Sequence, residues 1–390
     1  MKPLTKIIFL IGIVLVVLSC TEKTTTISIK NNLDLPRTFE TVTLTKSELK
    51  LKETDKLEDY VVVDIYQKPQ IVQYVDANKD GKAEVLLFQP KVKANDQSKY
   101  TLAKRKEKQK EEVVCYSRFV PERTDDYAWE NDKVAFRVYG PTAQKMKEDS
   151  IEGGTLSSGI DCWLKRVEYP IINKWYKKYT EKTGTYHKDT GEGLDNYHVG
   201  TSRGCGGIAV KGDTTYYISK NYIKYKRLMI GPIRTKFSLE YANWKANGKF
   251  VTETRVLTLD KGNNLTKHSV SLHGTDKISI GLTLHKKEGT ITKNKQQGWM
   301  SYWEKLEDSE LGTGIVVTNP IDITGFDIYV SDIEDVKNQY LESELDANEI
   351  NYYSGFGWKK SKQFQNSKEW NLYLANFSKR LKSPLEVIIK

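Results

Sequence analysis

Hydrophobic and polar positions alternate in short runs along most of the chain, and turn residues separate the runs. Clear examples are VVVDI at 61–65, TETRVLTL at 252–259 and ISIGLTLH at 278–285. Side chains of a strand point to opposite faces in turn, so a period of two predicts half-buried β-strands. So many evenly spaced strands predict an all-β protein. We expect a small N-terminal β-sandwich over residues 27–108 and a large antiparallel β-sandwich over residues 113–390.

Helical periodicity is rare in this pattern. The segment 172–179 (INKWYKKY) and the segment 368–381 are the best helix candidates. The second segment places apolar residues at 370, 373, 374, 377 and 381, which forms one stripe on a helix. The run KRKEKQKEE at 104–112 has no apolar period and marks the predicted boundary between the two parts.

The first residues have the pattern of an export signal. Lys2 and Lys6 precede an apolar run at 7–18 that is shorter than the roughly 20 residues of a membrane span, and the run ends in VLSC at Cys20. We expect a signal peptide over 1–19, and a tether over 20–26 that carries lipid on Cys20. The mature protein would then be held at the cell envelope by its lipid alone. An ordinary secretory signal with an incidental cysteine is the alternative.

Composition narrows the choice of partner. The formal charge of the chain is +10, and removal of Lys2 and Lys6 with the signal leaves 10 − 2 = +8. A basic protein suits an anionic partner. Nucleic acid is a poor candidate for an exported protein, whereas a carboxylated or sulfated polysaccharide is a good one. The 23 tyrosines and eight tryptophans favour the same class, because sugar rings stack on aromatic side chains.

The cysteines do not predict a metal site. Cys115, Cys162 and Cys205 are far apart and form no Cys-x-x-Cys pair, so the expectation for each is a small buried hydrophobe. A nucleophilic role for Cys205 stays open.

One acidic loop is a weak candidate for calcium. In DANKDG at 76–81, Asp76, Asn78 and Asp80 fall at ligand positions of a calcium loop, with Glu84 at the ninth position. The bidentate glutamate expected at the twelfth position is replaced by Leu87. A β-turn rich in Asp, Asn and Gly is the alternative. No cofactor is certain, and a divalent ion is left open.

Titratable side chains are densest in TYHKDTGEGLDNYHVGTSRGCGG at 185–207. The glycines fit neither nucleotide-binding pattern and a strand follows them, so we exclude a phosphate loop. His187, Asp189, Glu192, Asp195 and His198 offer metal ligands, but their spacing specifies no geometry. A histidine among acidic and tyrosine side chains also suits general acid–base chemistry. A hydrogen-bonded surface loop is the plain alternative.

Two further segments contain candidate binding residues. VPERTDDYAWEND at 120–132 places Arg123 near Trp129 and Asn131, so it offers a guanidinium for a carboxylate and a ring for a sugar. A structural ion-pair turn is the equal alternative. Arg234 follows a Gly-Pro turn on a predicted strand. The predicted substrate-binding set consists of Trp129, Asn131, Lys165, Glu192 and Arg234.

Five motifs carry a resemblance to a known family. They are VPERTDDYAWENDKVAFRVYGP at 120–141, SGIDCWLKR at 158–166, YHKDTGEGLD at 186–195, GTSRGCGG at 200–207 and GPIRT at 231–235. The chain resembles a family of exported proteins common in marine polysaccharide-degrading bacteria, and the resemblance covers nearly the whole mature chain. One branch is similar to the ulvan oligosaccharide dehydratase. The fold we expect for the large part is a galactose-mutarotase-like β-supersandwich with few short helices.

The resemblance implies removal of water from a glucuronic or iduronic acid at the non-reducing end of a sulfated oligosaccharide. A base takes the C5 proton and the C4 hydroxyl leaves, which gives a 4,5-unsaturated uronate. We expect Arg203 or Arg123 to neutralise the carboxylate. We expect His187, Tyr197 and Tyr186 to supply the base and the acid, with their order open. A non-catalytic glycan-binding lipoprotein and a uronate epimerase or mutarotase-like enzyme are the alternatives.

Overall fold

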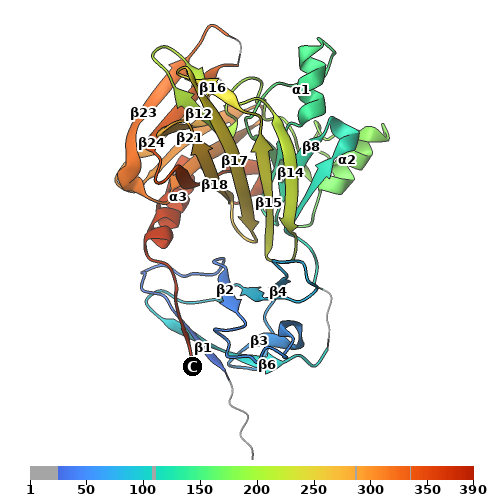
Figure 1. The fold of residues 1–390 in the computed structure, drawn as a ribbon, viewed down its shortest axis with the longest axis vertical. Coiled ribbons are helices and arrows are strands. Elements are labelled where there is room, and N and C mark those ends of the chain that lie inside the picture. Colours follow the sequence, from blue (N-terminus) through green and yellow to red (C-terminus); the bar gives the residue numbers. More distant parts are fainter. Residues whose placement is uncertain (1–24, 108–110, 286–287, 334) are drawn as a thin grey trace, which may run out of the picture.

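The computed structural model describes residues 25–107, 111–285, 288–333 and 335–390. Within these ranges the chain is built mainly from antiparallel β-sheets, so the all-β prediction is confirmed. Figure 1 shows a small unit at the bottom and a large unit above it. None of the helices in these ranges has the length and apolar character that a membrane span needs. Cys20 and the predicted signal lie outside the described residues.

The small unit is a sandwich of two sheets. The four-stranded sheet has the order β26, β1, β6, β3 and the three-stranded sheet has the order β2, β5, β4. The strands are β1 (Thr26–Lys30), β2 (Val42–Thr45), β3 (Tyr60–Asp64), β4 (Val72–Val75), β5 (Val85–Phe88), β6 (Gln97–Lys104) and β26 (Glu386–Ile389). Apolar residues from both sheets, such as Ile29, Leu44 and Phe88, form one buried core.

The last strand of the chain returns to this small unit. β26 pairs with β1 so that Ile27 faces Ile389, and the amide of Thr26 donates to the carbonyl of Lys390 at 3.0 Å. The sequence had assigned residues 113–390 to the large unit. The difference arises because β26 completes the four-stranded sheet, an arrangement that alternation alone cannot reveal.

The large unit contains three sheets. A nine-stranded sheet runs β14, β15, β17, β18, β25, β22, β21, β20, with β16 paired to β17, and faces two five-stranded sheets. The strands of the nine-stranded sheet are β14 (Tyr222–Met229), β15 (Arg234–Tyr241), β16 (Trp244–Ala246), β17 (Lys249–Asp260), β18 (Leu265–His273), β20 (Thr290–Asn294), β21 (Trp299–Leu306), β22 (Ser309–Val317) and β25 (Glu349–Trp358).

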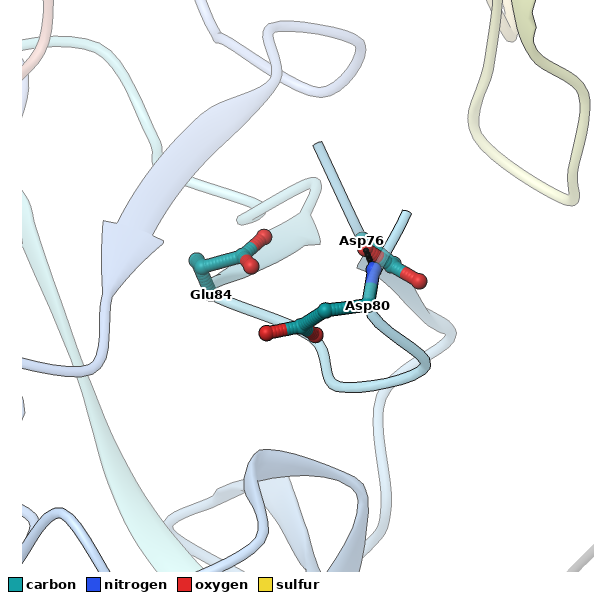
Figure 2. A group of neighbouring side chains, drawn as sticks. All are labelled: Asp76, Asp80 and Glu84. Carbon is teal, nitrogen blue, oxygen red and sulfur yellow. Dashed lines mark hydrogen bonds between the residues drawn. The ribbon is translucent and has the colours of Figure 1, made fainter. Parts of the chain in front are cut away.

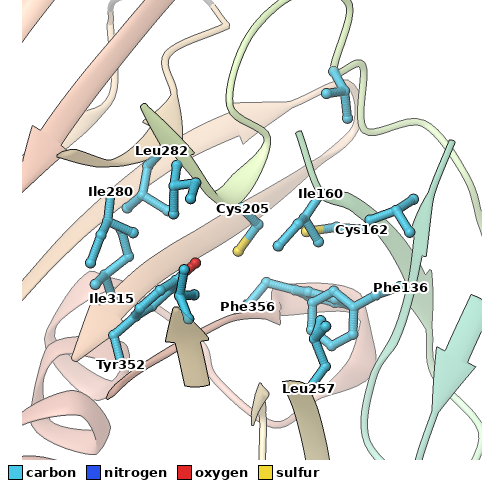
Figure 3. Close-up of a cluster of buried hydrophobic side chains, with 14 of the residues drawn as sticks. Phe136, Ile160, Cys162, Cys205, Leu257, Ile280, Leu282, Ile315, Tyr352 and Phe356 are labelled. Atoms are coloured by element: carbon cyan, nitrogen blue, oxygen red, sulfur yellow. The ribbon is translucent and has the colours of Figure 1, made fainter. Parts of the chain in front are cut away.

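The two five-stranded sheets lie opposite. One contains β7 (Tyr116–Val120), β8 (Asp126–Glu130), β9 (Ala135–Val138), β10 (Asp161–Lys165) and β11 (Gly193–Leu194). The other contains β12 (Cys205–Lys211), β13 (Tyr216–Tyr217), β19 (Lys277–Thr283), β23 (Ile323–Val330) and β24 (Lys337–Glu344). One apolar core joins all three sheets, and Figure 3 shows Phe136, Cys162, Cys205, Leu257 and Phe356 in it.

In the described part of the chain, three α-helices cover the outside of the large unit. They are α1 (Pro141–Glu148), α2 (Ile172–Thr180) and α3 (Ser367–Lys382), and the two helices expected from the sequence are α2 and α3. α3 packs Trp370 and Leu374 on the outer face of β21 and β22. α2 packs Trp175 and Tyr176 on the outer face of the sheet that contains β8 and β10. This sheet is therefore buried on both faces.

Gly204 joins the two five-stranded sheets. It forms a parallel bridge with Ile160 and has a φ of +59°, a region that favours glycine. A Cβ at this position would lie 2.0 Å from the carbonyl oxygen of Ile160. Backbone approach as close as this excludes any side chain.

We predict that Gly204→Ala destabilises the protein by more than 2 kcal/mol, because it adds a backbone clash to the cost of about 1–2 kcal/mol for a left-handed alanine. The matched control is Gly248→Ala, with a φ of +79° and open space around its Cβ position. That variant should lose only the cost of a left-handed alanine, about 1–2 kcal/mol. Chemical denaturation of both variants checks this, and equal losses would contradict the steric argument.

Candidate functional site

Charged side chains are buried on the outer face of β8, β9 and β10. Asp126, Arg137 and Asp161 lie on these three neighbouring strands, and Arg137 stands directly opposite Asp161 in the β9–β10 register. The residues between them, such as Phe136 and Cys162, point into the sandwich core. Helix α2 and the segment of residues 185–203, called the 185–203 loop below, cover this outer face.

Arg137 is at the centre of this group of charges. Its guanidinium lies 2.6 Å from the Asp161 carboxylate, 2.9 Å from Asp195 and 3.5 Å from Asp126. Asp195 belongs to the 185–203 loop, so this ion pair fixes the loop to the sheet. Tyr176 of α2 donates its hydroxyl to Asp126 at 3.0 Å.

The three carboxyl groups bind protons more tightly than usual. Burial raises the pKa of Asp161 to about 7, assisted by the negative charge of Asp195 and opposed by Arg137. Burial also raises the pKa of Asp126 to about 6, and it raises the pKa of Asp195. Near neutral pH the group therefore holds a proton that the unfolded chain would release.

Arg123 and His187 lie at the edge of this group and share two tyrosine rings. Arg123 Nε donates to the Tyr186 hydroxyl at 3.2 Å, and its guanidinium carbon lies 5.4 Å from the centre of the Tyr179 ring. The His187 ring lies 4.5 Å from the ring of Tyr186 and 6.3 Å from that of Tyr179. The sequence placed Arg123, Tyr186 and His187 in one site, and the structure brings these three together.

His187 has one anchored nitrogen. Its Nδ1 lies 2.9 Å from the carbonyl oxygen of Asp195, and half of its side-chain surface is exposed. A carbonyl only accepts hydrogen bonds, so Nδ1 carries the hydrogen and Nε2 of the neutral ring holds a free lone pair. Arg123 has no carboxylate within 4.0 Å in the described part of the chain, so its charge is available to an anion.

The 185–203 loop also forms one wall of a cavity. Along residues 195–199, Asp195, Tyr197 and Val199 are buried, whereas Asn196 is partly buried and His198 is exposed. The cavity, called the His198 pocket below, has a volume of about 450 Å³. Its polar lining is Asn196, His198, Thr283, His285, Glu307, Asp335 and Lys337.

Tyr197 and Arg203 do not join His187. The Tyr197 side chain is buried in the core, with its ring 4.7 Å from that of His285. Arg203 is buried in the junction between the sheets, where Nη1 donates to the Ser158 hydroxyl at 2.9 Å. Both therefore lack the access to a sugar that the sequence predicts for them, because their side chains are buried in the interior.

Three predicted substrate-binding residues have structural partners instead. Trp129 is completely buried and its indole donates to Thr266 at 2.9 Å. Asn131 donates to the carbonyls of Asp260 and Asn263. Lys165 is also fully buried and donates to Glu130 at 2.8 Å.

The remaining two predicted binding residues are ion-paired. Arg234 makes two hydrogen bonds to Asp260, at 2.6 and 2.7 Å. Glu192 accepts from Lys174 at 2.5 Å and from the Tyr169 hydroxyl at 2.6 Å. Cys205 points its thiol at the carbonyl of Gly355 inside the core, and all three described cysteines are buried and free.

The acidic loop of the small unit gathers three carboxylates. Oxygen atoms of Asp76, Asp80 and Glu84 lie within 4.8 Å of one another (Figure 2). Asp76 also accepts hydrogen bonds from the amides of Lys79, Asp80 and Gly81. The Asp76 carboxylate therefore stabilises the turn itself. The three carboxylates together offer the oxygen ligands that a hard cation such as calcium prefers.

Sequence reasoning did not find Arg137, Asp126, Asp161 and the pocket residue Asp335. The first three occur in strand patterns, AFRV, DYAWE and DCWLK, where a charged residue looks like the exposed side of a half-buried strand. An available signal was that the strand DCWLK precedes a segment rich in aromatic residues, EYPIINKWYKKY, which can cover a second face.

We predict that stability increases as the pH falls from about 8 to 5, because the folded carboxyl group of Asp161 takes up a proton that the unfolded chain does not. The stabilisation from this proton is present at low pH and is lost as the pH rises through about 7. Asp161→Asn should flatten this slope by up to about 1.4 kcal/mol per pH unit. Denaturant titrations at several pH values check this against the exposed control Asp213→Asn, and unchanged slopes in Asp161→Asn would refute it.

Two solved structures are similar to this chain in fold. An α-mannosidase from Enterococcus faecalis V583 matches with a TM-score of 0.53 at 10% identity, over 95% of this chain and 46% of the mannosidase. A glycosyl hydrolase family 38 protein from Enterococcus faecalis matches with a TM-score of 0.52 at 9% identity, over 95% of this chain and 48% of that protein. The chain thus spans about half the length of these structures, and the likeness concerns the fold alone.

Sequence similarity extends over nearly the whole chain. A protein of Formosa agariphila named "Uncharacterized protein P7" is 51% identical over 368 residues, which is 93% of each chain. Residues 29–387 match the family described as Domain of unknown function (DUF4861). The chain therefore belongs to the DUF4861 family.

Proposed function

We propose that the protein is a carbon–oxygen lyase that dehydrates the terminal glucuronic or iduronic acid of ulvan-type sulfated oligosaccharides. One observation carries the proposal: Arg123, which has no carboxylate within 4.0 Å among the described residues, shares two tyrosine rings with His187, a histidine with a free lone pair. The large β-sandwich, similar in fold to carbohydrate-active proteins, supports the carbohydrate class. With a lipid on Cys20, the enzyme would act at the cell envelope.

Arg123 would bind the carboxylate of the uronate. The C5 proton is adjacent to this carboxylate and is weakly acidic while the carboxylate keeps its full charge. A guanidinium that pairs with both oxygens stabilises the extra negative charge that develops when the proton leaves. Tyr186, which accepts a hydrogen bond from Arg123, holds the guanidinium in position.

His187 would take the C5 proton on Nε2. Its Nδ1–H is fixed on the carbonyl of Asp195, so the ring keeps the tautomer and the orientation that a base requires. The next step applies to glucuronate, in which the C5 hydrogen and the C4 oxygen lie on one face of the sugar. The imidazolium can therefore pass the same proton to the C4 oxygen, the C4–O bond breaks, and water leaves as the C4–C5 double bond forms.

We predict that the protein forms a conjugated enoate and a product lighter by one water from saturated, uronate-terminated ulvan oligosaccharides. His187→Ala should reduce kcat by about 10²–10⁴-fold. His273→Ala, a change at an exposed histidine of β18, should leave kcat unchanged. Absorbance and mass spectrometry give the measurement.

Other outcomes of that experiment would contradict the proposal. Deuterium incorporation at C5 without loss of water would indicate the epimerase alternative. Binding without any product across a panel of uronate oligosaccharides would indicate a glycan-binding protein.

We also predict that Arg123→Gln lowers kcat/KM by about 10²–10³-fold. The uronate carboxylate then has no guanidinium to stabilise the negative charge that develops as the C5 proton leaves. The matched control is Arg227→Gln, at an exposed position of β14. Steady-state kinetics on one defined oligosaccharide compare the two variants. Equal activity of Arg123→Gln and wild type would show that Arg123 does not take part in binding the uronate.

A further inference from the structure

We infer that a cavity between the small unit and the large unit binds an anionic sugar unit, at a site separate from Arg123 and His187. The cavity, called the inter-unit pocket below, has a volume of about 240 Å³. It lies on the outer face of the nine-stranded sheet, where Leu265 packs beneath α3, and a loop of the small unit around Phe39 closes it. Figure 1 shows the end of α3 above the small unit. The lining shares no residue with the Arg123–His187 site, so the inference goes beyond the proposed dehydration.

Cross-strand register places the sheet residues of the pocket side by side. Lys267 on β18 stands opposite Thr258 on β17 and opposite Tyr353 on β25. Arg234 on β15 stands opposite Asp260, which is two residues along β17 from Thr258. Residues two apart on a strand share a face of the sheet. These side chains therefore form one polar patch across four neighbouring strands.

The inter-unit pocket contains a cation that no acid balances. Its two acids are already paired, since Asp260 accepts two hydrogen bonds from Arg234 and Glu40 forms an ion pair with Arg37. In the described ranges, Lys267 has no carboxylate within 4.0 Å. Burial lowers the pKa of Lys267, and the neighbouring charge of Arg234 lowers it further. An anion beside Lys267 would therefore stabilise its charge.

A second cation comes from the last turn of α3. The guanidinium carbon of Arg380 lies 5.4 Å from the centre of the Phe377 ring and 5.9 Å from that of Tyr373. These contacts orient the side chain and leave its N–H groups available as donors. Among the described residues, Arg380 has no carboxylate within 4.0 Å. Because Arg380 and Lys267 line one small cavity, a sulfate or carboxylate group can accept hydrogen bonds from both.

The rest of the lining suits a sugar ring. Phe39, Tyr353 and Phe377 contribute aromatic surface, and Leu381 and Pro384 contribute apolar surface. Ligand pockets combine such surfaces with a few polar groups that fix the orientation of the ligand. The volume of about 240 Å³ is below the roughly 300–1,000 Å³ of pockets for drug-sized ligands. The pocket therefore suits one sugar unit with its anionic group.

Hydrogen bonds between the two units fix the walls of the pocket. Asn263 Nδ2, in the turn between β17 and β18, donates to the carbonyl of Phe39 at 3.1 Å. Arg37 Nη1 donates to the carbonyl of Ser383, at the end of α3, at 2.8 Å. A pocket that is held in shape before the ligand arrives has a lower entropy cost of binding.

The test is calorimetry on the full chain with four probes, which are glucose 6-sulfate, glucuronic acid, glucose and inorganic sulfate. All titrations use the Arg123→Gln background, so that no carboxylate binds at Arg123. We expect a charged sugar to bind at least about tenfold more tightly than glucose or inorganic sulfate. Of the two charged sugars, the tighter one identifies the preferred group as a sulfate or a carboxylate.

Two variants locate the binding. Lys267→Met and Arg380→Gln should each weaken binding of the charged sugar about tenfold, because each removes one charge-assisted hydrogen bond. Lys249→Met, at the exposed far end of β17, is the matched control and should leave binding unchanged. Thermal melts show whether each variant is folded, and the comparison of the four probes tests the inference without these variants.

Three results would overturn the inference. The first is that neither charged sugar binds more tightly than glucose. The second is that inorganic sulfate binds as tightly as glucose 6-sulfate, which would show that the sugar ring is not recognised. The third is unchanged binding in both Lys267→Met and Arg380→Gln. Dehydration is measured in a separate assay, so the proposed function and the inter-unit pocket can fail independently.

Discussion

The candidate site depends on the ion pairs between Arg137 and its neighbouring aspartates. Asp161 comes from the sheet and Asp195 from the 185–203 loop, so one guanidinium joins the covering segment to the strands below it. Because Asp195 is fixed through its side chain, its carbonyl group is fixed as well, and that carbonyl orients His187. Three carboxylates around Arg137 exceed its charge, and burial resolves the excess by retaining a proton.

This arrangement requires a sheet that is covered on both faces. Residues on one face of β8, β9 and β10 fill the sandwich core, while the other face lies beneath α2 and the 185–203 loop. A polar group on a covered face must be paired, because water cannot reach it. Glu130 illustrates this: it accepts from Lys165 and from the first amides of α2, so the same face that supports the aspartates also fixes the helix.

The local pattern of hydrophobic and polar residues predicted most of the strands and the helices α2 and α3. The local motifs also predicted that Arg123, Tyr186 and His187 lie together. Such local patterns were insufficient where cross-strand register decides which residues meet. Arg137 and Asp161 are 24 residues apart, and only the pairing of β9 with β10 brings them together. The same limit explains Lys165, a charged residue on an outward face that a helix then covers.

The pairing of β1 with β26 has a mechanical consequence. Thr26 and Lys390 exchange backbone hydrogen bonds, so the two ends of the folded chain leave it at one point of the small sheet. Tension on a tether before Thr26 would pull β1 away from β6 and β26. Such a load would open the small sandwich first. The aspartates and His187, which belong to the large unit, would lie outside the path of the force.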